Sequence, residues 1–315
     1  MKWWAMSAVA LLLLVISSWF IVNRPDKEMV SPVVKERPLD KYTIENLGKR
    51  EYKSQIIIDD EVSPGVFNFH FDSDGKKVTG LAHIPKSCKK CPVIAQFRGY
   101  VDKDIYQPGV GTKRTAEVFA KNGFISLAPD GLGYGGSDNP SDDVFEERFQ
   151  TYTTALNLLA GIESWDRAGK IGIWGHSNGG QIALTVLEIL PAGRQVPTVL
   201  WAPVSKPFPY SILYYTDEAD DRGRALRKKL AEFEKDYDVE LYNLTNYLDR
   251  IKVPVLIQQG TADEAVPKKW TDELVKQLKT EYVVYAGADH NMQPQWGRAV
   301  TQDVQFFQQS VGSNK

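Results

Sequence analysis

The sequence has few cysteine and histidine residues, and neither sign of charge dominates it. Its 315 residues include 2 cysteines and 4 histidines, and 38 Lys and Arg residues stand against 40 Asp and Glu residues. Two cysteines exclude a disulfide scaffold and a four-thiolate zinc site. The balanced charge provides no basic surface, so we expect no nucleic-acid partner.

Motifs for metals and cofactors are also missing from the sequence. No group of His, Cys, Asp and Glu residues has metal-ligand spacing, and neither a P-loop nor a dinucleotide-binding glycine motif occurs. We therefore expect no metal and no cofactor. The composition does not indicate an oligomeric state.

Hydrophobic residues, in contrast, are plentiful. They make up 43% of the chain, which predicts a large core and excludes a disordered or collagen-like protein. The length suits either one large α/β domain or two average domains.

The longest apolar run lies at the start of the chain. No charged residue occurs from Trp3 to Val22, and a helix of about 20 residues spans ~30 Å, the thickness of a bilayer core. A buried core helix would carry a polar stripe, and a cleavable signal peptide would end in an Ala-x-Ala site; this run has neither. We predict an uncleaved, single-pass signal-anchor over 1–23 with the rest of the chain outside the cytoplasm. Secretion after cleavage is the alternative.

A polar segment follows the apolar run. Residues 24–53 are rich in charge and contain three prolines without regular periodicity, which is typical of a linker or stalk. We predict that the folded body occupies residues 54–315.

Strand and helix patterns alternate through this body. Three early strands, 55–58, 66–71 and 78–84, include a hairpin with its turn at Asp72–Gly75. Apolar runs typical of strands buried on both faces follow, with helical stretches between them. This alternation predicts an α/β fold, a mostly parallel sheet with helices on both faces. The predicted buried strands are 92–97, 124–128, 171–174, 198–201, 253–258 and 282–285.

One stretch breaks the alternation. Residues 203–250 are rich in proline at first and then form a highly charged helix over 220–235. An insertion of this size after a strand often covers an active site as a cap, whereas a solvated surface helix is the alternative.

The strongest signal for chemistry is Gly175-His176-Ser177-Asn178-Gly179-Gly180. A strand comes directly before it, and a helix over 181–190 comes directly after. A serine on a sharp strand-to-helix turn needs glycines on both sides, because the surrounding backbone leaves no room for Cβ atoms. The helix N-terminus favours negative charge that develops at the serine. We predict that Ser177 is a nucleophile.

A nucleophilic serine needs a base, and the base needs an acid to hold it. His290 is the only histidine after Ser177, and it follows the last predicted strand. Asp263 lies on the loop after strand 253–258, so both residues are expected at the same edge of the sheet as Ser177. Glu264 is the alternative acid, and we interpret His176 as a packing residue.

These motifs resemble those of a known family. The elbow at 175–180, the block Gly260-Thr261-Ala262-Asp263 and the block Gly287-Ala288-Asp289-His290 are similar to the catalytic domain of prolyl oligopeptidase-family serine peptidases, which are α/β hydrolases. The glycine-rich segment 130–138 resembles the loop that the family carries after an early strand. The resemblance implies an α/β-hydrolase fold and hydrolysis through a Ser-His-Asp triad.

An oxyanion hole needs two backbone donors. The N–H of Asn178, which follows the nucleophile, is the first. The resemblance implies the N–H of Tyr100 as the second, on the loop after strand 92–97. Arg98 departs from the common His-Gly pattern there, and it either recognises an anionic substrate group or pairs with a carboxylate. In the insertion, Phe208, Tyr214 and Tyr215 are candidates for binding substrate, although core packing explains them equally well.

The substrate is less sharply indicated than the reaction. Large peptidases of the family carry a β-propeller before the catalytic domain, and residues 24–53 are too short for one. The Glu146-Glu147 pair matches the family's amino-terminus-binding glutamates only in letters, because it lies on a predicted helix of the body. We predict a serine peptidase without a propeller, acting on a short peptide, with an esterase on a small ester as the alternative. A non-catalytic binding protein of the same fold is the second alternative.

The two cysteines are close together in sequence. Cys88 and Cys91 precede a strand at a loop, and in an exported domain such a pair could close a small local disulfide, which the sequence alone leaves open. A redox motif is disfavoured because no helix follows to lower a thiolate pKa.

Overall fold

The computed structural model describes residues 35–217 and 219–312. The predicted signal-anchor, 1–23, lies outside these residues. Within them, no helix is long and apolar enough to cross a membrane. The chain divides into the unit Met1–Arg37 and the body Pro38–Lys315, and the body is described below.

Nine strands of the described residues form one sheet, in the order β1-β2-β3-β5-β4-β6-β7-β8-β9. The strands from β1 to β3 pair antiparallel, β3 is antiparallel to β5, and the strands from β5 to β9 along the sheet are parallel. This confirms the predicted mostly parallel sheet. The bounds are β1 Ile57–Ser63, β2 Val66–Ser73, β3 Lys76–His83, β4 Cys91–Phe97, β5 Ile125–Pro129, β6 Ala168–His176, β7 Thr198–Trp201, β8 Val255–Gly260 and β9 Glu281–Tyr285.

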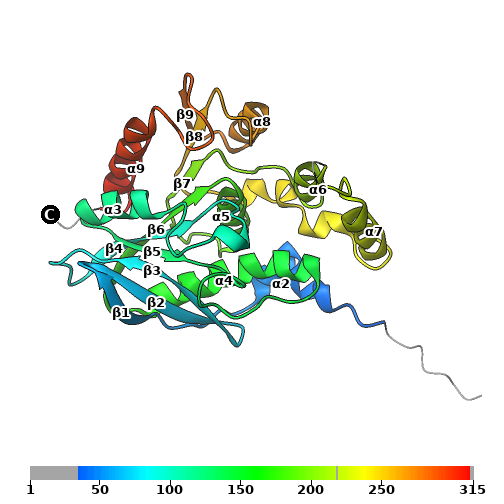
Figure 1. Cartoon of the computed structure of the whole chain (residues 1–315), viewed down its shortest axis with the longest axis horizontal. Helices are drawn as coiled ribbons and strands as arrows, with labels where there is room; N and C mark the ends of the chain where they lie inside the picture. The colour runs from blue at the N-terminus through cyan, green and yellow to red at the C-terminus, as the bar shows by residue number, and fades with distance from the viewer. Residues whose placement is uncertain (1–34, 218, 313–315) are drawn as a thin grey trace, which may run out of the picture. The chain divides into compact units, whose positions relative to one another are not determined.

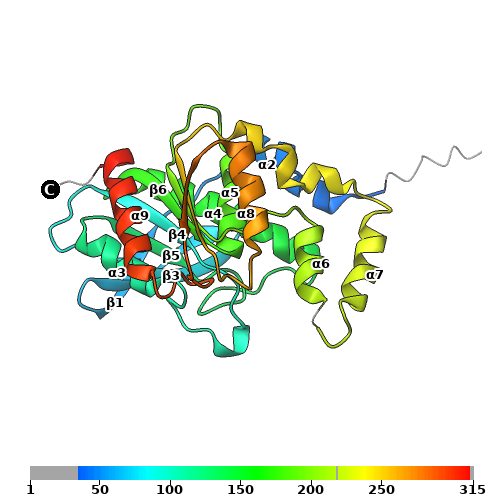
Figure 2. The ribbon, with the colours of Figure 1, turned by 90° about the horizontal axis from the view of Figure 1, so that it is seen from above.

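Helices cover both faces of the sheet, as Figures 1 and 2 show. The pair α3 and α9 packs on one face, where Phe119, Trp174 and Phe307 form part of a buried cluster. On the other face α4 packs against α5, and α5 packs against α2. The helix bounds are α2 Ile44–Lys49, α3 Lys113–Lys121, α4 Val144–Ser164, α5 Asn178–Ile189, α6 Tyr210–Thr216, α7 Arg224–Phe233, α8 Lys268–Leu278 and α9 Trp296–Ser310.

Helix α4 shows how the sequence pattern becomes a packed element. The Asp143 carboxylate caps its start by accepting the N–H groups of Phe145 and Glu146. The five apolar residues predicted at helical spacing, Phe145, Phe149, Tyr152, Leu156 and Leu159, are all buried. The helix packs against α5 and against strand β2.

The predicted linker, 24–53, is wrong from Pro38 onward. A 3-10 helix, η1 (Pro38–Tyr42), and α2 belong to the folded body, and Leu39, Tyr42, Ile44 and Leu47 are buried in the main core. A six-residue helix is too short to show a helical period, and the segment around it is rich in charged residues. The sequence pattern therefore did not predict it.

The insertion after β7 forms α6, α7 and three short 3-10 helices, η3 (Val239–Tyr242), η4 (Leu244–Asn246) and η5 (Leu248–Arg250). Helices α6 and α7 lie side by side beyond the sheet, in olive and yellow in Figures 1 and 2. The charged helix predicted over 220–235 is shorter at both ends, because Gly223 has a positive φ and a turn follows Phe233.

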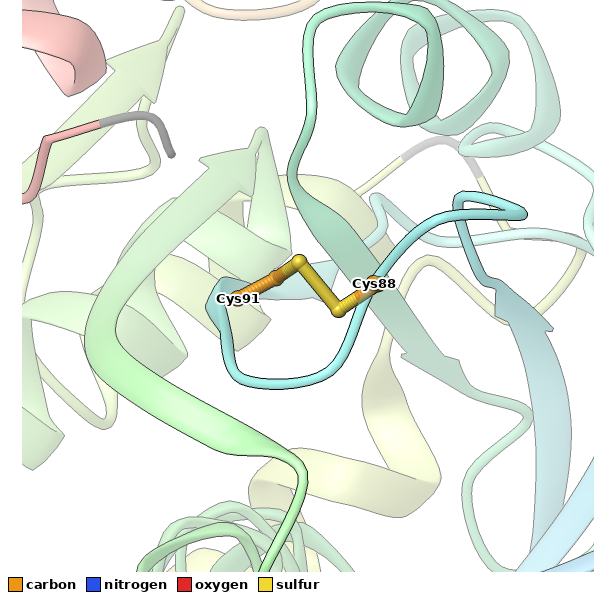
Figure 3. Close-up of a disulfide and its surroundings, with 2 residues drawn as sticks. All are labelled: Cys88 and Cys91. Carbon is orange, nitrogen blue, oxygen red and sulfur yellow. A yellow bond between two sulfur atoms is a disulfide. The ribbon is translucent and has the colours of Figure 1, made fainter. Parts of the chain in front are cut away.

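Cys88 and Cys91 form a disulfide, a question that the sequence left open. The bond closes the short loop that leads into β4 (Figure 3).

Candidate active site

Ser177 lies on a sharp turn between β6 and α5. Its backbone has φ 56° and ψ −119°, a left-handed φ that non-glycine residues rarely adopt. A Cβ on Gly179 would lie 1.9 Å from the Phe97 carbonyl oxygen, so only glycine lets α5 approach the end of β4 so closely. The sequence pattern predicted this strand-elbow-helix arrangement.

Backbone hydrogen bonds hold the elbow in this conformation. The Ser177 N–H donates to the carbonyl of Trp201 at 3.0 Å, and the Ser177 carbonyl accepts the N–H of Val204 at 2.9 Å. The elbow is thereby tied to the end of β7 and to the loop that follows it.

Asp263 and His290 lie in direct contact. Oδ2 of Asp263 accepts a hydrogen bond from Nδ1 of His290 at 2.9 Å, which leaves Nε2 of the imidazole for other partners. The Asp263 side chain has no exposed surface. Its Oδ1 accepts the N–H groups of Ala265 and Val266, and Gln259 donates to Oδ2. Glu264 is exposed on the same loop, so Asp263 is the carboxylate that reaches His290.

The hydrogen bonds to Asp263 favour its ionised form. Burial alone raises the pKa of this carboxyl, but the hydrogen bond and charge of His290 and the donors on Val266 and Gln259 lower it below its usual range. Asp263 is therefore negatively charged at neutral pH and stabilises a positive charge on His290.

The two loops that carry these residues are joined through their backbones. The N–H of Ala262 donates to the carbonyl of Ala288 at 2.9 Å. A Cβ on Gly260 would lie 2.2 Å from that same carbonyl oxygen, so glycine is required where β8 ends. This close approach brings the Asp263 loop and the His290 loop together.

His176 is buried and holds the backbone of His290, which is consistent with a packing residue. Its Nε2–H donates to the backbone carbonyl of His290 at 2.9 Å, and the two imidazole rings lie 4.6 Å apart. Burial, together with the charge of His290, lowers the pKa of His176 to about 4, so His176 is neutral at physiological pH. Its position before Ser177 is the only feature of the sequence that indicates this contact with the His290 loop.

The loop after β4 passes directly over Ser177. A Cβ on Gly99 would lie 3.0 Å from the Cβ and 3.5 Å from Oγ of Ser177. Tyr100 follows Gly99, and Asn178 begins α5, so the two predicted oxyanion donors belong to segments that meet at Ser177. Among the described residues, the Ser177 hydroxyl has no hydrogen-bond partner, and none joins it to His290.

A cavity of about 360 Å³ opens beside this loop. Tyr100 and Asn178 line it together with residues of the glycine-rich loop after β5 and of α4. None of the described residues of the insertion, 203–250, lines it. The charged residues of its wall are Arg98, Asp130, Glu147 and Arg148.

Arg98 lines the cavity but is bound to backbone. Its Nη1 donates to the Gly99 carbonyl and its Nη2 to the Asp130 carbonyl, at 2.9 and 3.0 Å. The guanidinium also lies over the rings of Tyr134 and Tyr106. Arg98 thus braces two loops of the cavity and forms no ion pair with a carboxylate in the described part of the chain.

The aromatic candidates of the insertion lie away from the cavity. Phe208 is buried in an aromatic cluster with Phe145, Phe149 and Phe233, which is the packing role that the sequence had left open. Tyr214 and Tyr215 are partly exposed on α6 and pack on Trp270. The Tyr215 hydroxyl donates to the carbonyl of Ala265, so α6 touches the loop of Asp263.

The two glutamates of α4 are both paired. Glu146 bonds with Lys41, Tyr42 and Ser141, and Glu147 forms an ion pair with Lys103 at 3.1 Å. Only Glu147 lines the cavity. The pair therefore does not act as a unit.

The sheet order, the serine elbow and the His290–Asp263 contact at the carboxyl edge of the parallel strands define an α/β hydrolase. The sequence model of the prolyl oligopeptidase family matches residues 111–314, which is more than half of the chain and includes Ser177, Asp263 and His290. The chain belongs to this family, and it is a serine hydrolase.

Solved structures with the same fold include both esterases and a peptidase. Est1E from Butyrivibrio proteoclasticus, solved with ferulic acid, is 20% identical with a TM-score of 0.59, over 77% of this chain and 98% of that one. An acetyl xylan esterase from Paenibacillus sp. R4 is 18% identical with a TM-score of 0.63, over 83% of this chain and 91% of that one. A puromycin-hydrolyzing peptidase from Mycobacterium tuberculosis is 17% identical with a TM-score of 0.58, over 81% of this chain but 41% of that one.

Proposed function

We propose that this chain hydrolyses an ester or amide bond through a triad of Ser177, His290 and Asp263. The observation that carries the proposal is the hydrogen bond from His290 Nδ1 to a buried, ionised Asp263. That bond fixes the tautomer in which Nε2 is free to accept a proton. His290 belongs to the loop that His176 holds beside the elbow of Ser177.

The reaction follows from these positions. Ser177 Oγ attacks the substrate carbonyl carbon while His290 Nε2 takes the hydroxyl proton. The negative charge on the carbonyl oxygen is stabilised by the N–H groups of Asn178 and Tyr100, each worth ~3–4 kcal/mol in the transition state. His290 then returns the proton to the leaving group, and an acyl-enzyme remains. Water, deprotonated by His290, releases the acid and restores Ser177.

The leading substrate class is a short peptide. Peptide hydrolysis is the activity implied by the family, and the described strands all join one sheet, so they form no propeller that filters large substrates. The cavity beside Ser177 suits a few side chains rather than a folded protein.

A small carboxylic ester is the second candidate. The acetyl xylan esterase matches this chain over 91% of its own length, whereas the peptidase matches over 41% of its length. The match therefore extends over nearly the whole esterase, and this supports an ester as the second candidate substrate.

One comparison separates these candidates. We would measure kcat/KM of the full chain on a short acyl ester and on a matched prolyl amide, with Ser177→Ala as the baseline for both. Comparable rates on ester and amide support the peptidase, and fast ester turnover without amide cleavage supports the esterase. Activity of Ser177→Ala equal to that of the wild type contradicts both.

The membrane location is a separate proposal. It rests on the uncharged run from Trp3 to Val22, with the catalytic body placed outside the cytoplasm.

A further inference from the structure

The wall of the cavity beside Ser177 includes Arg148, a cation that has no anionic partner among the described residues. Arg148 lies in the second turn of α4, and its Nη1 donates to the side-chain Oδ1 of Asn178 at 2.9 Å. Asn178 follows the nucleophile directly and is a proposed oxyanion donor. The guanidinium of Arg148 is therefore hydrogen-bonded to the residue that directly follows Ser177.

The donors of Arg148 are mostly unused. Within the described residues no carboxylate lies within ion-pair distance of it, and its Nε is buried without a hydrogen-bond partner. Nη2 also has no partner there, but it is not fully buried. A donor that is buried without a hydrogen-bond partner, as Nε of Arg148 is, is costly for the folded protein.

The other charged groups of the cavity have more partners than Arg148. Glu147 pairs with Lys103, and the Asp130 carboxyl accepts the hydroxyls of Thr79 and Tyr106. In the described part of the chain Arg98 also lacks an ion pair, and its Nε is likewise buried without a partner, but both of its Nη atoms donate to carbonyls. Among the described residues, Arg148 is thus the cation of this wall that keeps an Nη nitrogen without a hydrogen bond.

We propose that Arg148 binds a carboxylate carried by the substrate, and so selects substrates with a free acid near the bond that is cleaved. The proposal rests on the serine hydrolase function above. A single carboxylate matches the one guanidinium of Arg148, whose Nη2 has no partner among the described residues. Asp130 and Glu147 lie in the same wall, and their negative charge disfavours a ligand group that carries two negative charges.

The test compares probes that differ only in charge. For the acyl side, mono-4-nitrophenyl adipate is paired with the analogue in which a methyl ketone replaces the free carboxylate. For the leaving-group side, the acetate ester of 3-hydroxybenzoate is paired with that of the corresponding methyl ketone. The measured quantity is the ratio of kcat/KM between charged and neutral probe, for the full chain at neutral pH.

The wild type should prefer the charged probe of one pair by about tenfold to a hundredfold, as expected for a charge-assisted hydrogen bond. Arg148→Gln should lower that ratio to about one, and Arg148→Lys should keep part of it. Arg114→Gln is the matched control. Arg114 is exposed and lies over the ring of Trp296, outside this cavity, so the substitution removes the same charge at a different place. Its ratio should equal that of the wild type.

A second readout does not depend on turnover. Adipate monoamide, which carries a single carboxylate, should bind when titrated calorimetrically into the Ser177→Ala chain, and the added change Arg148→Gln should abolish that binding. Equal ratios in wild type and Arg148→Gln, with binding of the monoamide unaffected, would overturn the role of Arg148. Absence of turnover on every probe, with binding of the monoamide still dependent on Arg148, would instead contradict the proposed hydrolysis alone.

Discussion

At the scale of single residues, the site depends on how Ser177 and Asp263 are held. The left-handed φ of Ser177 costs on the order of 1–3 kcal/mol, which the surrounding structure must offset. Hydrogen bonds to Trp201 and Val204 do so. Asp263 has no exposed side-chain surface, yet four groups donate to it, and this keeps its charge inside the protein.

Asp263→Asn tests this arrangement. The amide would donate to Nδ1 of His290 and favour the tautomer with the proton on Nε2, which cannot accept the serine proton. We expect kcat to fall by ~10⁴-fold while the fold persists. Steady-state kinetics with near-ultraviolet circular dichroism measures both. Glu264→Gln is the control and should retain activity; if it were the more damaging change, Glu264 and not Asp263 would be the acid.

The candidate site residues could be predicted from the sequence, whereas the residues that hydrogen-bond to them could not. Ser177, Asp263 and His290 could be identified because each residue type is rare or follows a strand in the required order. His176 and Arg148 could not. The hydrogen bond of His176 depends on the path of the His290 backbone, and nothing in the pattern of α4 indicates that Arg148 points at Asn178.

At the scale of elements, α5 combines the elbow with a buried acid. Glu188, near the end of the helix, is 1% exposed, and neither carboxyl oxygen has a hydrogen-bond partner. Burial raises the pKa of Glu188 well above its usual range, although Arg250 opposes this and Asp249 adds to it.

The raised pKa of Glu188 makes stability fall as pH rises. Above the unfolded pKa of about 4.3 the unfolded chain loses this proton while the folded chain retains it, so the free energy of unfolding decreases until the folded pKa is reached. Glu188→Gln cannot ionise and should raise Tm at pH ~8 more than at pH ~4, by about 2–4 °C for each kcal/mol recovered. Thermal unfolding at both pH values measures this. An equal change in Tm at the two pH values would show that Glu188 does not titrate with folding.

Element boundaries were predicted less well than element order. The strands buried on both faces were found because their apolar runs are continuous, as in β4 and β7. Strand β1 was predicted too short, because it is an exposed edge strand whose Asp59, Asp60 and Glu61 give no alternating pattern. Helix α2 was missed for its length, although Ile44 and Leu47 are fully packed.

At the scale of the whole molecule, topology assembles the site. Ser177 follows β6, Asp263 follows β8 and His290 follows β9, and these strands are parallel, so their carboxyl ends meet at one edge. The folded body begins at Pro38, which separates it from the apolar run at the start of the sequence.

This separation predicts how the chain partitions. The full chain should sediment with membranes and be released by detergent, because an apolar run of about 20 residues inserts stably. A chain that begins at Lys35 keeps Leu39 and Tyr42 in the core, so it should remain in the supernatant with the same kcat/KM. Fractionation followed by activity assay measures both. Full-length protein found only in the supernatant would contradict the anchor.

The most direct test of the account is covalent labelling of the full chain with an organophosphonate probe, read by mass spectrometry. A working triad activates only Ser177, so the account predicts one label per chain, on the peptide that contains Ser177, and none in a folded Ser177→Ala variant. A wild-type chain that is folded but unlabelled, or labelled at another residue, would contradict it.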